Sequence, residues 1–349
     1  MSSPFTFTLP PELSAKEPPE RRGLARDHVR LMVIEDGGGR VSHTRFDRLG
    51  QFLRRGDLLI FNTSRTLPAS LQACAEPVGP CMEIRLAEHL PDDSWLALLL
   101  CQRGDPFSCG LREGMQIVFG EGLTATVSGR DERIQRLWRL RFSKTGTELI
   151  NLLYRLGRPV RYEYVSAPWD LDYYQTVYAR EPGSAEMPSA GRAFTWRLLF
   201  DLKRQGVEMA YLVLHTTLSS YMDDELDALH LASEEEYFIS PATAEKVNRA
   251  RREGGRIIAV GTTVVRALES VADEEGRIQP GHGYTRLRIT PEHKLKAVDG
   301  LLTGLHEPEA SHLDLLAAFL PPDQIRKAYE EAVRLRYLWH EFGDLNLIL

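Results

Sequence analysis

The sequence predicts an α/β fold: a mostly parallel or mixed sheet with flanking helices, interrupted by an inserted small antiparallel β-barrel domain. After residue 195, segments with helical spacing alternate with short apolar runs, which is typical of a parallel sheet covered by helices. Between about residues 70 and 142, short strand-like runs are separated by turn residues, which favours a small barrel. We therefore expect one split α/β domain, 1–67 with 145–349, and one barrel domain, 68–144.

The composition is that of an ordinary globular protein. The 349 residues are 43% hydrophobic and 26% charged, and a chain of this length can bury a large core in two domains. The longest apolar run, Leu96 to Cys101, is too short to span a bilayer, and the N-terminal residues do not resemble an export signal. We therefore expect a cytoplasmic protein without membrane contact. The net charge of −6 excludes an overall basic surface, so a nucleic acid would need a local basic patch.

Four cysteines fall within one stretch of the expected barrel, at Cys74, Cys81, Cys101 and Cys109. Their spacings, C-x6-C and C-x7-C, match no zinc knuckle or ribbon. We expect buried, reduced thiols and no metal site.

The first elements follow from apolar runs and turn residues. The proline-rich segment 9–13 is expected to be extended. Apolar runs predict strands at 29–35 and 58–62, with a short helix at 46–53 between them. Three consecutive glycines at 37–39 predict a turn.

Five strands are expected in the barrel. In the last of them, Trp138, Leu140 and Phe142 alternate with Arg139 and Arg141, so one face is largely apolar. The expected strands are 81–87, 95–101, 116–119, 123–128 and 137–142.

The remaining chain returns to alternating helices and strands. Leucines at i, i+3, i+4 and i+7 predict a helix from Leu149 to Leu156, with Gly157 as its stop. Ser240 and Pro241 are typical of a helix start. Further elements are a helix around 198–202, a strand at 210–214, a strand at 257–260 and an amphipathic helix around 325–333.

The stretch 256–270, RIIAVGTTVVRALES, predicts a strand, a glycine turn and a helix. Such a turn leaves helix amides unpaired beside the hydroxyls of Thr262 and Thr263, which suits a nucleotide, carboxylate or phosphate. The alternative is an ordinary strand–helix junction in which Thr262 or Thr263 caps the helix. Gly261 and Arg266 complete the candidate pocket, although neither GxGxxG nor GxxxxGK[ST] is present.

Three residues are candidates for proton transfer. His215 ends an apolar strand, where a histidine can serve as a general base or as a structural hydrogen-bonding group. Glu236 belongs to an acidic run that is more often solvated. His306 lies between an apolar run and a helix that starts near Ser311.

Candidate binding residues lie in four further stretches. Each has a structural alternative: mutually paired charges before the first strand, turn chemistry after the strand at 58–62, and a long structured connection for the aromatic and small-residue loops. The arginines 133, 136, 139 and 141 of the barrel either touch phosphates or form a solvated strand face. The candidates are Arg26, Asp27, Arg30, Asn62, Arg65, Gln175, Tyr178, Ser189 and Gly191.

Taken together, these stretches resemble one family, the S-adenosylmethionine:tRNA ribosyltransferase-isomerases of queuosine biosynthesis. The resemblance covers nearly the whole chain. It rests on RDHVRL at 26–31, GDLLIFNTSRTLPASL at 56–71, YYQTVYA at 173–179, MPSAGRAFT at 187–195, AVGTTVVRALES at 259–270, LLTGLHEP at 301–308, LLAAF at 315–319 and GDLNLI at 343–348.

The resemblance implies an α/β domain with an inserted barrel and an enzyme, a transferase and isomerase, of tRNA modification. It implies S-adenosylmethionine as the donor, no metal, and transfer of its ribosyl part to a 7-aminomethyl-7-deazaguanine base in a tRNA anticodon. Epoxyqueuosine forms, and adenine and methionine leave. The expected partner is the anticodon stem–loop, bound by a monomer through a local basic patch.

Several polar positions depart from the family pattern. N-D-T-R reads Asn62-Thr63-Ser64-Arg65, the histidine of A-P-T-A-G-L-H-F reads Ala193, and L-H-V-G-x-G-T-F reads 214–221 without its glycines. Because the apolar framework matches while polar positions differ, we also weigh two alternatives. One is a paralogue acting on another nucleoside or small molecule, and the other is a non-catalytic nucleotide- or RNA-binding protein.

In the favoured interpretation, His215 is the base or orients it, with Glu236 and His306 as further catalytic candidates. Arg26, Arg65 and Arg266 hold carboxylate or phosphate groups. Residues 261–263 line the nucleoside pocket. This interpretation requires the strand ends to converge on one cleft.

Overall fold

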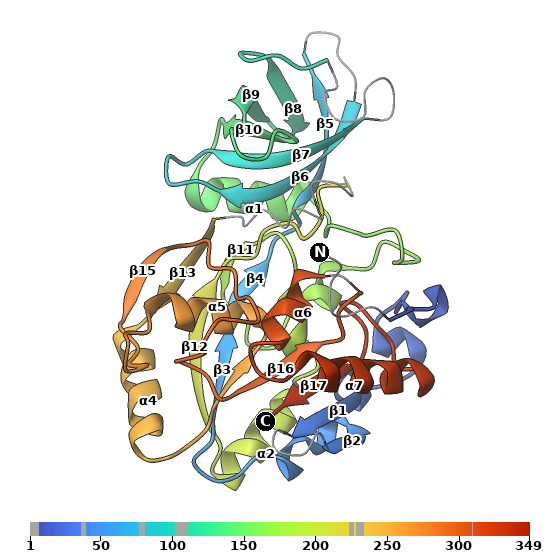
Figure 1. Ribbon diagram of the computed structural model, residues 1–349. Coiled ribbons are helices and arrows are strands. Elements are labelled where there is room, and N and C mark those ends of the chain that lie inside the picture. Colours follow the sequence, from blue (N-terminus) through green and yellow to red (C-terminus); the bar gives the residue numbers. More distant parts are fainter. Residues whose placement is uncertain are drawn as a thin grey trace.

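The computed structural model describes residues 7–35, 40–76, 81–101, 110–222, 227, 234–308 and 310–349. Figure 1 shows a six-stranded barrel standing on one end of a larger α/β body. The expected fold class, a mixed sheet with flanking helices and an antiparallel barrel, is confirmed. The glycines at 37–39 lie outside the described residues. No helix within the described ranges is long and apolar enough to cross a membrane.

A nine-stranded mixed sheet forms the larger body. Neighbours β12, β3, β14 and β16 are mutually parallel, so their carboxyl ends meet at one edge, which we call the carboxyl edge. In order across the sheet, the strands are β15 (Gly281–Thr285), β13 (Glu235–Ile239), β12 (Glu208–Leu214), β3 (Leu58–Asn62), β14 (Ile257–Val260), β16 (Gly300–Gly304), β17 (Leu345–Ile348), β1 (Arg30–Glu35) and β2 (Arg40–Arg45).

Helices cover both faces of the sheet because its central strands are apolar on both sides. Leu58 and Ile60 of β3 face one core, and Leu59 and Phe61 face the other. The first core is closed by α4 (Pro241–Arg252), α5 (Thr262–Val271), α6 (Ser311–Leu316) and α7 (Pro322–Arg334). The second is closed by α2 (Trp196–Gln205) and the 3-10 helix η4 (Phe46–Gln51).

Local capping explains where two of these helices begin. Thr195 accepts a hydrogen bond from the amide of Leu198 at the start of α2, and Ser240 caps α4. The expectation that Thr262 or Thr263 caps α5 is wrong. The cap is Gly261, with φ of 97° and no side chain, and both threonines already lie in the first helical turn.

Short 3-10 helices occupy several connections. The segment expected to be extended near the N-terminus is one of them, because Pro11 fixes a helical φ and starts η1 (Pro11–Leu13). The others are η2 (Pro19–Arg22), η3 (Arg26–His28), η5 (Leu171–Tyr174) and η6 (Ser189–Gly191).

The barrel closes from six antiparallel strands. Leucines of α1 (Gly146–Leu156) pack into the barrel core. The expected barrel domain, 68–144, therefore stays a prediction, because α1 contributes to the barrel core although it lies beyond residue 144. Around the barrel the order is β10 (Leu137–Phe142), β7 (Trp95–Cys101), β6 (Cys81–His89), β5 (Ser70–Ala75), β8 (Gln116–Gly120) and β9 (Leu123–Arg130).

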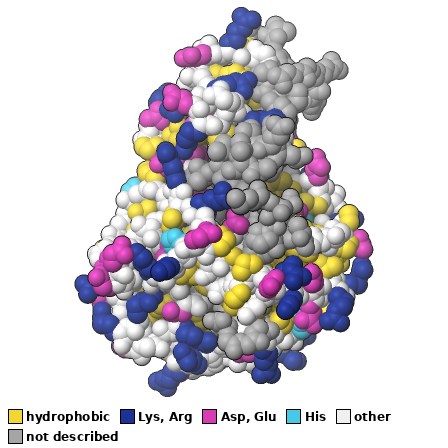
Figure 2. Space-filling model, in the orientation of Figure 1, with side chains coloured by type: hydrophobic (Ala, Val, Ile, Leu, Met, Phe, Trp, Pro, Cys, Tyr) yellow, Lys and Arg dark blue, Asp and Glu magenta, His cyan; other side chains and the backbone are white. Residues whose placement is uncertain are grey.

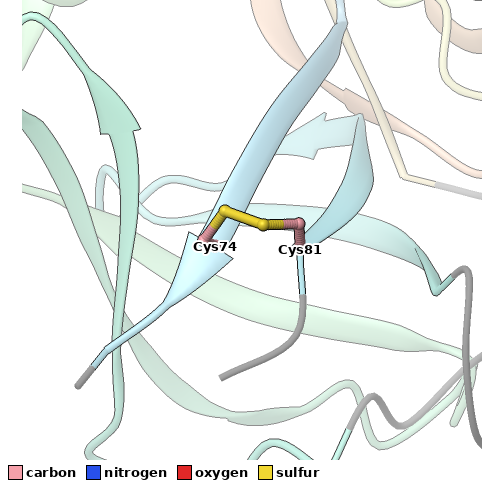
Figure 3. Close-up of a disulfide and its surroundings, with 2 residues drawn as sticks. All are labelled: Cys74 and Cys81. Carbon is pink, nitrogen blue, oxygen red and sulfur yellow. A yellow bond between two sulfur atoms is a disulfide. The ribbon is translucent and has the colours of Figure 1, made fainter. Parts of the chain in front are cut away.

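The expectation of reduced thiols in the barrel is wrong. Cys74 of β5 and Cys81 of β6 form a disulfide, shown in Figure 3. Cys101 is also disulfide-bonded, whereas Cys109 lies outside the described residues. The register explains the bond, because Cys74 and Cys81 stand directly opposite each other on neighbouring strands, with Cα atoms 4.1 Å apart.

A two-stranded ribbon crosses above the carboxyl edge. It pairs β4 (Ser64–Thr66), which follows β3 directly, with β11 (Glu181–Ser184). The register shifts between Pro182 and Ser184, so Gly183 occupies a bulge. This ribbon brings residues 64 and 184 together at the ends of the parallel strands.

Candidate functional site

His215 lies at the carboxyl edge, one residue after β12, and a chain of hydroxyls holds its ring. Its Nδ1 is 2.7 Å from Oγ of Ser64, which in turn is 2.5 Å from Oγ of Ser184. The amide of Thr216 donates to Ser184 Oγ at 3.0 Å. Burial lowers the pKa of His215 below its usual 6.5, although the charge of Glu236 opposes the shift. The imidazole is therefore neutral near pH 7, as a general base must be.

Gly183 lets the ribbon approach this histidine. A Cβ on Gly183 would lie 2.4 Å from Nδ1 and Cε1 of His215, closer than real Cβ contacts. The bulge thus places a bare backbone against the imidazole ring. Sequence reasoning did not single out Gly183, Ser64 or Ser184 within their stretches, because β4 and β11 are far apart in the chain.

Asn62 ties three elements together beneath His215. Its Oδ1 accepts from the amides of Ser64 and Leu214, both at 3.0 Å. Its Nδ2 donates to the carbonyl of Leu214 at 2.7 Å and to Oγ1 of Thr263 at 3.4 Å. Asn62 is fully buried, so the side chain fixes β12 and the start of α5 relative to β3.

The start of α5 lies beside this cluster. A Cβ on Gly261 would meet Ala190 of η6 at 3.6 Å, so the glycine turn faces the small-residue loop. Thr262 and Thr263 are buried in the first helical turn. Arg266 forms an ion pair with the buried Glu235, which occupies the guanidinium inside the protein.

Glu236 neighbours His215 through the backbone of β13. The amide of His215 donates to the Glu236 carbonyl at 2.9 Å. The Glu236 side chain accepts from Nε2 of His282, 2.6 Å away, when that nitrogen carries a proton. Glu236 is thus a held carboxylate rather than part of a freely solvated run.

A groove of about 710 Å³, which we call the His215 groove, runs from His215 along β12 and β13. It contains two of the three catalytic candidates, His215 and Glu236. Its walls are Thr63, Arg180, Glu181, Met209, Ala210, Tyr211, Leu212, Val213, His215, Glu236, Phe238, Ser240, Ala242, Thr243, Lys246 and His282.

A second, much smaller cavity of about 10 Å³ contains Arg26 and Ser189, and we call it the Arg26 cavity. Its wall also includes Arg192 and Glu341. Arg26 donates to the carbonyls of Gln175 and Arg192 and pairs with Glu20, so its donors are largely used within the protein.

Asp27 and Arg30 are paired with other side chains of the protein, as the structural alternative for the charges before the first strand expects. Asp27 accepts from Oγ1 of Thr195 at 2.9 Å and pairs with Arg197 at the start of α2. Arg30 is bound to Asp344, and its guanidinium lies 4.2 Å from the ring centroid of Tyr337. Both side chains hold elements in place.

Gln175, Tyr178 and Gly191 also act in packing. Gln175 exchanges two side-chain hydrogen bonds with the backbone of Thr66, which extends β4. Tyr178 is buried against Phe61. A Cβ on Gly191 would lie 1.9 Å from the Tyr178 hydroxyl, so this close approach requires glycine.

Arg65 differs from the other candidate arginines. Its Nε is buried without a hydrogen-bond partner within the described part of the chain, and its guanidinium lies 5.6 Å from the ring centroid of Tyr154. A buried donor of this kind favours an anionic ligand that completes its hydrogen bonding.

His306 lies apart from His215. Its Nε2 is 2.9 Å from Oγ1 of Thr303, and its ring stacks on His312 with centroids 4.5 Å apart. Burial and then the neighbouring His312 and His340 hold its pKa well below 6.5. Its carbonyl accepts from Trp339, so a packing role accounts for its contacts.

Sequence reasoning missed Glu186, which follows the ribbon. Its carboxylate accepts from the amide and the hydroxyl of Ser219 and from the hydroxyl of Tyr162. Burial raises the pKa of Glu186 to about 8. Glu186 is joined to the segment after His215, because Oγ1 of Thr216 donates to the Glu186 carbonyl.

The expectation that Arg26, Arg65, His215 and Thr262 share one cavity stays a prediction. His215 lines the His215 groove and Arg26 lines the Arg26 cavity, whereas Arg65 and Thr262 line neither. At the carboxyl edge, Asn62 donates to the carbonyl of Leu214, and the β4–β11 ribbon joins Ser64 to Ser184. No group of His, Cys, Asp and Glu within the described ranges is arranged to hold a metal ion.

Comparison with known proteins decides the family. The family model described as "Queuosine biosynthesis protein" matches residues 2–348. The chain belongs to this family. Relatives within the family include the S-adenosylmethionine:tRNA ribosyltransferase-isomerases of Symbiobacterium thermophilum, 41% identical, and Carboxydothermus hydrogenoformans, 38% identical. Each match covers 99% of this chain and at least 98% of the relative.

A solved structure of the queuosine biosynthesis family agrees with the fold. The S-adenosylmethionine tRNA ribosyltransferase of Thermotoga maritima is 34% identical over 99% of this chain and all of that chain, with a TM-score of 0.56. The resemblance drawn from the sequence is therefore confirmed, and these matches do not favour a different activity.

Proposed function

We propose that this protein is an S-adenosylmethionine:tRNA ribosyltransferase-isomerase acting in the cytoplasm. It transfers the ribosyl part of S-adenosylmethionine to a 7-aminomethyl-7-deazaguanine base in tRNA, and epoxyqueuosine, adenine and methionine result. The observation that carries the proposal is the neutral His215, held by Ser64 on the His215 groove at the carboxyl edge. Ligand sites of open α/β sheets lie at such an edge.

His215 is the proposed general base. The sulfonium of the donor makes the neighbouring C5′ hydrogens acidic, so a positioned base can begin the reaction. With Nδ1–H donated to Ser64, His215 keeps a lone pair on Nε2 for that proton. Because the pKa of His215 is lowered, activity should persist below pH 7 and fall only when the imidazole becomes protonated.

The residues around the start of α5 fit a nucleoside donor. Gly261 and Ala190 leave room for close approach, and the first-turn amides and hydroxyls of Thr262 and Thr263 are suited to ribose and carboxylate oxygens. Arg65, with its buried unpaired Nε, is the arginine that would hold the donor carboxylate. Arg26 and Arg266 instead keep these residues in place through their own ion pairs.

The acceptor tRNA would bind as an anticodon stem–loop to a monomer. Figure 2 shows Lys and Arg side chains interspersed with Asp and Glu on the visible face, over both the barrel and the larger body. Phosphate contacts on this face would therefore be scattered, and base contacts in the groove would contribute more to recognition.

The deciding experiment measures adenine release from S-adenosylmethionine with a stem–loop RNA that carries 7-aminomethyl-7-deazaguanine. Wild-type protein should release adenine, and His215→Ala should lower kcat by roughly 100- to 10,000-fold, as expected for loss of a general base. His43→Gln is the matched histidine control and should leave kcat unchanged. His43 lies on β2, the outermost strand on the side of the sheet away from β12.

Two results would contradict the proposal. Wild-type protein that binds both substrates without releasing adenine would favour a non-catalytic binding protein. Adenine release that survives His215→Ala would retain the activity but remove His215 from its role.

A further inference from the structure

Among the residues that the structure describes, no helix covers one face of the sheet at β12, β13 and β15. Along β12, Ala210, Leu212 and Leu214 point into the first core, so Tyr211 and Val213 point to the opposite side. On that side the second core reaches only as far as Met209. The strands β12, β13 and β15 therefore present an open surface, which is the floor of the His215 groove.

Two aromatic side chains stand half-exposed on this floor. Tyr211 is 36% exposed and Phe238 is 47% exposed, although large apolar side chains usually seek burial. Val213 of β12 pairs directly with Phe238 of β13. Tyr211, two residues before Val213, is therefore the diagonal neighbour of Phe238 on the same face. Tyr211 is supported from behind by Phe61, with ring centroids 5.7 Å apart and planes stacked.

Cations border the aromatic pair. Arg180 and Lys246 line the groove, and Nζ of Lys246 donates to the carbonyl of Met209 at 2.9 Å. Burial raises the pKa of Tyr211, and the charge of Arg180 opposes this shift, which places the guanidinium near the phenol. Glu181 and Glu236 also line the groove, but Glu236 is occupied by His282.

We propose that Tyr211 and Phe238 form a stacking platform for an unpaired nucleotide of the tRNA anticodon loop, beside the base that reacts at His215. The inference rests on the proposed function. Proteins bind single-stranded RNA by stacking bases on aromatic rings while nearby cations follow the phosphates. The groove combines both features, and it leads to His215. An unpaired loop supplies splayed bases, whereas a duplex does not.

The test uses fluorescence anisotropy of a labelled anticodon stem–loop RNA, which needs no turnover. Phe238→Ala and Phe238→Leu should each weaken binding roughly 5- to 100-fold, the range for loss of one base–aromatic stack. Phe238→Tyr and Tyr211→Phe keep the ring and should bind within about twofold of wild type. Phe200→Ala is the control, because Phe200 is 58% exposed on α2 and lies outside the groove.

Phe238→Leu separates stacking from simple apolar docking. If Phe238→Leu binds RNA as wild type does, an apolar side chain suffices without a ring, and the inference of base stacking is overturned. Equal binding by Phe238→Ala, or failure of wild type to bind the RNA, overturns it too. Adenine release by wild type is measured separately. If wild type releases adenine and the Phe238 variants bind RNA normally, the stacking platform alone is refuted. If the Phe238 variants bind RNA more weakly but wild type releases no adenine, only the proposed activity is refuted.

Discussion

Gly183→Ala tests whether the position of the His215 ring governs activity. The backbone of Gly183 does not have a left-handed φ, so alanine is compatible with it and the effect is steric. A Cβ there would lie 2.4 Å from the imidazole, whereas carbon contacts are comfortable near about 3.5 Å. The ring must move by about 1 Å, which stretches its 2.7 Å hydrogen bond to Ser64 beyond useful length.

A displacement of about 1 Å in a catalytic group costs roughly 100-fold in rate, or about 2.7 kcal/mol in activation free energy. We expect Gly183→Ala to lower kcat for adenine release by this factor, with little change in thermal stability. Gly281→Ala is the matched control, because nothing lies within 4 Å of its added Cβ. An unchanged kcat for Gly183→Ala would refute the reasoning. So would a further loss of roughly 100-fold when Gly183→Ala is added to His215→Ala, because that variant has no imidazole ring to displace.

Three further predictions concern stability. Asn62→Ala leaves the buried amides of Ser64 and Leu214 unpaired and should lower the free energy of unfolding by about 2–4 kcal/mol in urea titrations; a loss below about 1 kcal/mol would contradict this. Glu186, with its pKa raised from 4.5 to about 8, holds a proton that the unfolded chain releases, so stability should fall as pH rises through that window. Glu186→Gln should weaken this dependence in melts across pH, and Glu88, with its pKa raised to about 7, should account for part of what is left; a dependence unchanged by Glu186→Gln would contradict this. Removing the Cys74–Cys81 disulfide with Cys74→Ser and Cys81→Ser together should destabilise the protein by up to about 2.5 kcal/mol, and melting identical to wild type would exclude a stabilising role.

The sequence was most informative where periodicity and local capping determine structure. Apolar runs ending in polar residues located β3 and β12, and therefore placed Asn62 and His215 at one edge of the sheet. Ser240 and Gly157 marked a helix start and a helix end, and both do so in the structure. Such features depend on neighbours a few residues away, so a single sequence contains them.

Contacts between segments that are far apart in the chain cannot be predicted from local sequence patterns. Ser64 and Ser184 meet only because β4 pairs with β11, and neither strand has a strong apolar pattern. The same holds for Arg30, whose partner Asp344 lies at the other end of the chain. A charged residue beside a strand cannot be assigned to a ligand or to an internal partner until the tertiary contacts are known.

The order of strands makes one short strand a bridge within the larger sheet. Strand β17 lies between β16 and β1 and joins the hairpin of β1 and β2 to the remaining strands. Residues 345–348 are therefore the link through which the hairpin is hydrogen-bonded to the rest of the sheet. Deleting these residues should separate the hairpin from the backbone hydrogen bonding of the sheet, far more damage than the loss of four residues suggests.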